Sequence, residues 1–305
     1  MEKRFFVIVL LFSLVTEIVR GQQDSQYTNY MYNTMSFNPA YTGTRGMLSA
    51  VGLYRTQWVG LPGAPETVNF SVQAPVGKKV GLGFNINSDK IFIANETNLD
   101  LMFSYQLDVG QNANLSLGIK AGLNLFDIDF NRANVGPNDQ NDINANITNK
   151  IAPQIGVGAF YYTETFYTGL SVPNLLKTDH FNDVQRNVKT ERLHLYYMVG
   201  NVFELNQELK FKPSGLLKVV SGAPIQVDVS ANFLLYEKVT LGMAYRWDAG
   251  INALAAFQIS DKLLIGYGYD WETTQLSQYN NGSHEIFLRF DLISKRNKIL
   301  SPRFF

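Results

Sequence analysis

The chain has 305 residues, a formal net charge of +0 and no cysteine. The balanced charge argues against a nucleic-acid-binding protein, which needs a basic surface, and the lack of cysteine excludes disulfides, thiol nucleophiles and cysteine metal sites. Charged residues make up 17% of the chain and aromatic residues 13%, whereas soluble domains carry about 25% charged residues. This composition is compatible with a membrane β-barrel that has aromatic girdles and with a soluble all-β protein.

The first 21 residues have the features of a secretory signal peptide. Lys3 and Arg4 give a positive start, residues 5–14 form an apolar core, and Val19-Arg20-Gly21 is a plausible cleavage site. A spanning helix needs about 20 apolar residues, and neither this core nor any later segment is long enough. An exported membrane protein without such a helix has to be a closed barrel, because lipid offers no partner to unpaired backbone groups.

Residues 22–46 precede the first expected strand, and we interpret them as a possible plug of the barrel. A barrel of about 14 strands is wide enough to need filling. The segment contains a turn at Asn38-Pro39, because proline fixes its own φ and pushes the preceding residue toward extended geometry. It is also too aromatic for a free tail, since it contains Tyr27, Tyr30, Tyr32 and Phe37.

Residues 47–305 are expected to form the barrel domain, because short segments with period-two alternation follow one another through this region. They predict an all-β fold, an antiparallel outer-membrane β-barrel of about 14 strands. In the less regular segment 209–220, Pro213 and Gly215 suggest a bulge. The expected strands are 47–58, 67–75, 80–86, 99–107, 115–125, 155–161, 166–172, 193–199, 209–220, 225–233, 239–247, 251–259, 263–271 and 286–292.

Charged residues inside these strands all fall on the polar phase of the alternation. An Arg or Lys that faces lipid at mid-depth costs about 2–4 kcal/mol, so this pattern favours a lipid-exposed barrel with a polar lumen. Trp247 and Trp271 end their strands where aromatic belts lie. Either the lumenal charges pair with one another or they line a selective pore. They are Asp100, Lys120, Asp228, Arg246, Asp270, Glu285 and Arg289.

Two long polar connections, 131–150 and 175–190, are expected on the external face, and short turns such as 236–238 and 260–262 on the periplasmic face. Residues 138–146 are rich in Asn and Asp but lack the residue order of a calcium loop. We interpret them as a solvated loop.

No catalytic, cofactor or metal site is expected. The three histidines, His180, His194 and His284, have no metal-ligand spacing, and a Gly-x-Ser-x-Gly motif is missing. Ser283 and His284 are adjacent on a strand, so their side chains point to opposite faces and cannot exchange a proton.

Several ordered blocks carry a resemblance to a known family. They are Asn38-Pro39-Ala40-Tyr41 and Tyr54-Arg55-Thr56-Gln57-Trp58, then residues 74–83 and 89–91, and finally 282–286 and 301–305. With these blocks the chain resembles the PorP/SprF family, outer-membrane proteins of the type IX secretion system of Bacteroidetes. Phe92 departs from the pattern, because a glycine is expected after Asp89-Lys90-Ile91.

The resemblance implies a non-enzymatic component of type IX secretion in the outer membrane. Its partners would be membrane lipid, the secretion machinery and a secreted surface adhesin, or the C-terminal sorting domain of that adhesin, in support of attachment or gliding motility. Two other functions remain open, a passive channel for small solutes and a barrel enzyme. The candidate structural or partner-contact residues are Asn38, Pro39, Tyr41, Arg55, Trp58, Gly282, His284 and Glu285.

Overall fold

The computed structural model describes residues 30–130, 147–176 and 193–292. The expected signal peptide, the stretch 138–146, His180 and the terminal block 301–305 lie outside the described residues. Among the residues that are described, no helix is long and apolar enough to cross a membrane.

Antiparallel strands make up most of the described chain, with three short 3-10 helices, η1 (Thr34–Ser36), η2 (Pro39–Tyr41) and η4 (Gln275–Gln278). The strands are β1 (Leu48–Thr56), β2 (Glu66–Val76), β3 (Val80–Ile91), β4 (Ala94–Gly110), β5 (Ala113–Ile128), β6 (Ile147–Tyr162), β7 (Phe166–Val172), β8 (His194–Asn201), β9 (Phe203–Glu204), β10 (Leu209–Val220), β11 (Gln226–Leu235), β12 (Val239–Arg246), β13 (Gly250–Ser260), β14 (Leu263–Glu272) and β15 (Ser283–Leu292).

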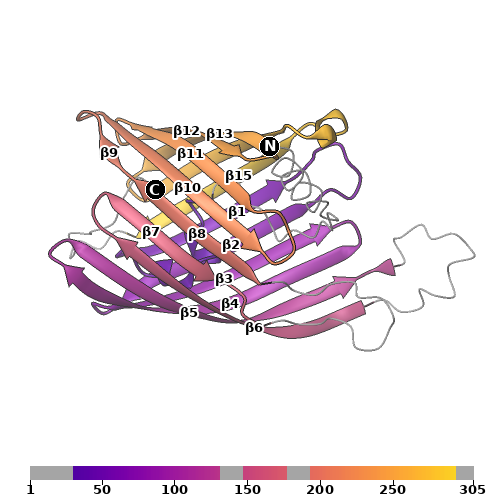
Figure 1. Ribbon diagram of the computed structural model, residues 1–305, viewed down its shortest axis with the longest axis horizontal. Helices are drawn as coiled ribbons and strands as arrows, with labels where there is room; N and C mark the ends of the chain where they lie inside the picture. The colour runs from indigo at the N-terminus through magenta and orange to yellow at the C-terminus, as the bar shows by residue number, and fades with distance from the viewer. Residues whose placement is uncertain (1–29, 131–146, 177–192, 293–305) are drawn as a thin grey trace, which may run out of the picture.

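Each strand pairs with its neighbours in chain order, and β1 pairs with β15, so the sheet closes on itself (Figure 1). The short β9 follows β8 after a break at Val202 and pairs with the same neighbour, β10. When β8 and β9 are counted as one strand of the wall, the sheet is a closed antiparallel barrel of 14 strands. The predicted fold class is therefore confirmed.

Alternation decides which side of the wall each residue occupies. In β15, Ser283, Glu285 and Arg289 are buried on the lumenal side, while Ile286 and Leu288 between them are exposed on the outer surface. The same division holds in β5, where Lys120 is buried and Ile119 is exposed. The outer surface is consequently apolar over the height of the barrel, as a lipid-facing surface has to be.

The two ends of the barrel differ in the length of their connections. Short turns lie at the end where β1 begins and β15 finishes. The strands β1, β5, β7 and β14 finish at the opposite end, and each is followed in the sequence by a longer connection, 57–65, 129–146, 173–193 and 273–282. Outer-membrane barrels have short periplasmic turns and longer external loops. We therefore describe the end with the long connections as the external end.

Several strands extend further than their alternation predicted. Residues 147–150, expected in a loop, belong to β6, and β3 and β4 include Asn87 and Asn95, which are residue types typical of turns. The buried Asn87 is tolerated because lumenal amides bond to each other, as Asn69 does to Asn87 at 3.5 Å and to Asn85 at 2.9 Å, whereas Asn95 is exposed. The expected bulge is wrong, because β10 pairs with β11 in unbroken register through Pro213; the irregularity lies on the other side, between β8 and β9.

Candidate functional site: a segment in the lumen and a charged pocket at the mouth

Residues 30–46, named here the lumenal segment, lie inside the barrel and lead into β1. Most of their side chains are buried, and Ala40 and Thr42 have no exposed surface. The segment contains η1 and η2 and packs through η2 against β4, β5 and β6. It is therefore a folded insert between the walls.

The turn at Asn38-Pro39 is fixed by its own side chain and by the wall. The Asn38 side-chain oxygen Oδ1 accepts from the Ala40 backbone N–H at 3.0 Å, and the side-chain amide Nδ2 donates to the Ala159 carbonyl at 3.2 Å. The wall carries glycine where the turn touches it. A Cβ on Gly118 would stand 2.2 Å from the Ala40 nitrogen, and one on Gly158 would stand 2.2 Å from Asn38 Oδ1.

Aromatic side chains in the lumen receive the segment. Tyr32 packs on Phe287 with ring centroids 4.2 Å apart, and Tyr41 meets the edge of Phe160 at 5.3 Å. Phe287, on β15, is only 1% exposed although it occupies the polar phase of its strand. The lumen is thus not uniformly polar, and part of it forms a hydrophobic core with the segment.

Polar contacts tie both ends of the segment to the wall. Arg45 forms an ion pair with Asp291 at 2.8 Å, and Asp291 also pairs with Arg289 at 3.1 Å. At the other end the Tyr30 hydroxyl donates to Ser214 at 3.4 Å. Burial raises the pKa of the Tyr30 phenol and of the Tyr32 phenol above the ordinary value, because the phenolate would lose its hydration.

A chain of buried hydrogen bonds runs from the segment into the wall of β2–β6. It starts where the Asn33 amide donates to Asn69 at 2.9 Å, and it passes through the ion pair of Lys120 with Asp100 at 3.1 Å. Each side chain in it has at least one polar partner, which offsets part of the cost of burial, although Asn124 Oδ1 is buried without a hydrogen-bond partner. Its members in order are Asn33, Asn69, Asn85, Asp100, Lys120, Gln154, Asn98, Asn124 and Glu96.

The seam between β1 and β15 brings the two ends of the sheet together. Arg55 lies opposite Glu285 in the register, and their side chains pair at 3.4 Å. Arg55 also pairs with Asp270 of β14 at 2.6 Å. The Arg55 and Glu285 side chains are fully enclosed, so this is a buried ion-pair cluster at the external end of the barrel.

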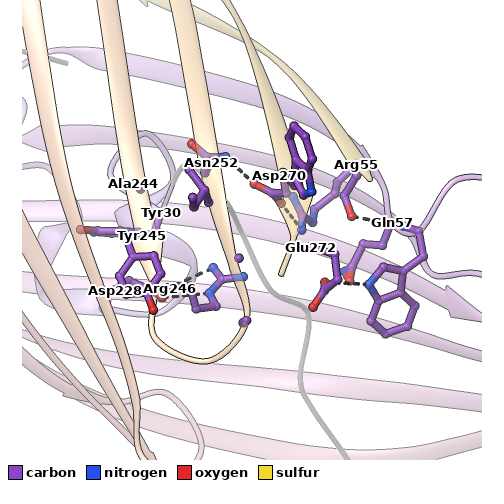
Figure 2. Close-up of a pocket in the computed structure, with 16 residues that line it drawn as sticks. Tyr30, Arg55, Gln57, Asp228, Ala244, Tyr245, Arg246, Asn252, Asp270 and Glu272 are labelled. Atoms are coloured by element: carbon purple, nitrogen blue, oxygen red, sulfur yellow. Dashed lines mark hydrogen bonds and ion pairs between the residues drawn. The ribbon is translucent and has the colours of Figure 1, made fainter. Parts of the chain in front are cut away.

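A pocket opens beside this cluster at the external mouth, and we name it the mouth pocket (Figure 2). Its empty volume is about 550 Å³, part of which is open to solvent. Arg246 contacts Asp228 on one side at 2.9 Å, and Asn252 and Arg55 both bond to Asp270 on the other. Trp58 and Glu272 form its rim, and Tyr30 of the lumenal segment lies against it.

The rim is held by contacts between the 57–65 and 273–282 connections. Trp58 has a φ of 45°, which is uncommon for a bulky residue. Its backbone N–H donates to Ser283 Oγ at 3.2 Å and its indole N–H to Glu272 at 3.3 Å. Gly282, with a φ of 81°, accepts from the Val59 N–H at 2.9 Å.

The structure therefore divides the candidate residues of the sequence into three groups. Asn38, Pro39 and Tyr41 lie in the lumenal segment, whereas Arg55, Trp58, Gly282 and Glu285 lie at the seam and the mouth. His284 belongs to neither, because it faces outward, where its Nδ1 lies 2.6 Å from the Tyr267 hydroxyl. The seven predicted lumenal charges face the lumen; the ion pairs among them and their neighbours are Asp100–Lys120, Asp228–Arg246, Arg55–Asp270, Arg55–Glu285 and Arg289–Asp291.

Some residues of the site were missed by reasoning from sequence. Asp291 continues the polar phase of Glu285 and Arg289, so the alternation could have identified it, but Arg45 lies outside any strand and gives no such signal. Lys212 lies 4.9 Å above the ring of Tyr167, a lumenal contact that spacing does not reveal. Within the described ranges, no three His, Asp or Glu side chains are grouped as metal ligands would be.

Comparison with known proteins identifies a family for this chain. The family described as type IX secretion system membrane protein PorP/SprF matches residues 19–290. Proteins with curated descriptions gave no match.

Among solved structures, the chain is similar to the CymD monoaromatic hydrocarbon channel, with 10% identity, a TM-score of 0.48 and coverage of 86% of this chain and 93% of that one. It is also similar to the Acinetobacter baumannii outer membrane protein Omp33, with 7% identity, a TM-score of 0.44 and coverage of 81% and 98%. For the NanC porin the identity is 9%, the TM-score 0.43 and the coverage 80% and 100%.

The cellular location follows from the wall and the family description together. A closed barrel with an apolar outer surface leaves no unpaired sheet edge to the lipid, and the matching family is one of membrane proteins. The chain is an outer-membrane protein.

Proposed function

The chain belongs to the PorP/SprF family of type IX secretion system membrane proteins, and we propose that it receives or anchors a secreted partner at the outer membrane. The partner would be a surface adhesin with a C-terminal sorting domain, and the role would be its display on the cell surface or its use in gliding motility. On this proposal the chain binds its partner and catalyses no reaction.

One observation favours binding over conduction. The lumenal segment fills the interior with buried backbone, as at Ala40, and with aromatic side chains such as Tyr32, which packs on Phe287 of β15. A passive channel for solutes needs a continuous aqueous path. We propose that residues 22–46, of which 30–46 are described, act as a plug that keeps the barrel closed while the external end binds the partner.

The external end offers the surface for this contact. The connections 57–65 and 273–282 contact each other over the mouth, where the Asn281 N–H donates to the Val59 carbonyl at 2.8 Å. Binding residues are often carried by connections that a rigid scaffold positions. The buried cluster at Arg55 supplies such a scaffold here.

The proposal is tested in cells that lack the chain. Surface display of the adhesin is measured by proteolysis of intact cells, and gliding by the movement of single cells. We expect both to be lost and to return when the parent chain is supplied. The same chain, purified and inserted into planar bilayers, should show no steady conductance.

Normal display in the deleted strain would contradict the proposed function. Steady conductance with a graded size limit for solutes would favour the passive channel instead. A control variant, Gly52→Ala, should restore display fully, because a Cβ at this position on β1 meets nothing within 4 Å.

A further inference from the structure

The mouth pocket combines a negative charge with an aromatic rim. We propose that it binds a positively charged side chain, that of Lys or Arg, on a polypeptide segment of the secreted partner. This inference rests on the proposed function, because it specifies the chemistry by which the external end recognises a partner.

Carboxylates outnumber cations around the pocket. Two guanidinium groups, those of Arg55 and Arg246, face three carboxylates that line the pocket, those of Asp228, Asp270 and Glu272. Both guanidinium groups are already engaged, Arg55 with Asp270 and Glu285, and Arg246 with Asp228. Counted over the described residues, the site therefore has more carboxylates than guanidinium groups.

The excess charge lies nearest to solvent at Glu272. Its carboxylate accepts from the Trp58 indole at 3.3 Å and from the Thr274 hydroxyl at 2.8 Å, and both donors are neutral. In the described part of the chain no cation lies within ion-pair distance of Glu272. A carboxylate in this state at the rim of a cavity can accept a charge-assisted hydrogen bond from a ligand.

The aromatic partner of this carboxylate is Trp58, which also lines the pocket. A cation placed near an indole face and a carboxylate gains from the ring quadrupole as well as from the charge. The backbone of Trp58 is held at a φ of 45° by contacts from Ser283 and Glu272. Strain of this kind is retained only where the surroundings fix it, so the indole is positioned before any ligand arrives.

The mouth pocket is open to solvent on one side and reaches the lumenal segment on the other. The empty space of about 550 Å³ at the mouth includes open solvent. Tyr30 lies at the pocket, so a bound side chain would contact the end of the lumenal segment. Tyr30 would then take part both in binding at the mouth and in holding the lumenal segment in place.

The test uses the full-length protein in detergent micelles and the tripeptide acetyl-Gly-Arg-Gly-amide as probe. Binding is measured by calorimetry at low salt, beside the citrulline tripeptide, which has nearly the same shape and no charge. We expect the arginine peptide to bind at least about tenfold more tightly than the citrulline peptide, since a charge-assisted bond is lost. Its affinity should fall as salt is added.

Glu272→Gln should lower the affinity for the arginine peptide about fivefold, as expected for a partly exposed ion pair. The matched control is Glu237→Gln, an exposed glutamate in the turn at the opposite end of the barrel, which pairs with Lys210 at 3.2 Å. This variant should bind as the parent does. The heat-induced mobility shift on electrophoresis verifies that each variant is folded.

Equal binding of the arginine and citrulline peptides to the parent protein would overturn the inference, whatever the variants do. An unchanged affinity in folded Glu272→Gln, or an equal loss in Glu237→Gln, would overturn it as well. These results leave the proposed function standing if display still depends on the chain. Conversely, normal display without the chain removes the proposed function even if the peptide binds.

Discussion

Arg55 and Glu285 stand opposite each other where the first and last strands of the barrel meet, and their side chains pair at 3.4 Å inside the wall. Residues 230 positions apart in the chain thus share one buried ion pair. Asp270 joins them from β14, so a single guanidinium pairs with two carboxylates at the seam.

Arg55→Met should destabilise the barrel. It leaves the buried Glu285 carboxylate and the partly buried Asp270 carboxylate without their guanidinium, and losing one partner of a buried pair costs about 3–5 kcal/mol. The free energy of unfolding is measured by urea titration in lipid vesicles. Lys79→Met is the control, because Lys79 pairs with Asp108 at 3.3 Å with side chains that are 46% and 71% exposed. Its loss should cost less than about 1 kcal/mol; equal losses in both variants would contradict the buried role of Arg55.

Gly118→Val should loosen the lumenal segment. The new side chain would overlap the Ala40 backbone, and overpacking of this kind costs about 1–3 kcal/mol. Trypsin cleavage after Arg45, which is 7% exposed, reports on the segment. When cleavage occurs through an opened state, its rate should rise about five- to a hundredfold. Gly52→Val, on the outer side of β1, should leave the rate unchanged, and an unchanged rate in Gly118→Val would show that the wall does not seat the segment.

The barrel could be predicted because the side that each strand residue faces depends on its neighbours in the sequence. Alternation and the phase of charges such as Lys120 and Glu285 fix which side faces lipid, and both are visible in a few neighbouring residues. The ends of β3–β6 were not predictable, because a residue such as Asn87 resembles a turn residue until its lumenal partner, Asn69, is known.

The site was harder to predict than the wall. Aromatic residues before β1 indicated that the lumen could be occupied, but nothing local to Gly118 or Gly158 reveals that a turn from another part of the chain rests on them. The mouth pocket likewise joins Trp58 to Glu272 and Ser283 across the closure of the sheet. Such contacts depend on register, which a single sequence does not specify at the seam.

High pH should weaken the seating of the lumenal segment. Burial raises the pKa of Tyr30 and Tyr32 in the folded state above their ordinary value of 10.0. A raised pKa means that their contribution to stability is complete below about pH 10 and declines as pH rises toward the folded pKa. Urea unfolding at pH 8 and pH 11 should show a smaller loss for Tyr30→Phe/Tyr32→Phe than for the parent. Identical losses would mean that neither phenol is buried in the folded protein.

Lys120→Met should both destabilise the wall and loosen the lumenal segment. Its ammonium pairs with Asp100 at 3.1 Å and donates to Gln154 at 3.3 Å, in the middle of the hydrogen-bond chain that begins at Asn33. Without the cation, the buried Asp100 carboxylate is uncompensated, at a cost of about 3–5 kcal/mol. The rate of trypsin cleavage after Arg45 should therefore rise, as is also expected for Gly118→Val.

The double variant Lys120→Met/Asp100→Asn separates charge from packing. Neutralising Asp100 removes the buried charge but keeps a side-chain oxygen that can accept a hydrogen bond from Asn85. In the parent chain Asn85 donates to Asp100 at 3.3 Å. Because truncating one partner of a buried pair is costly mainly through the charge left behind, the double variant should recover most of the lost stability. If it is as unstable as the single variant, the ammonium acts through its packing, and the chain of hydrogen bonds does not couple the wall to the lumenal segment through charge.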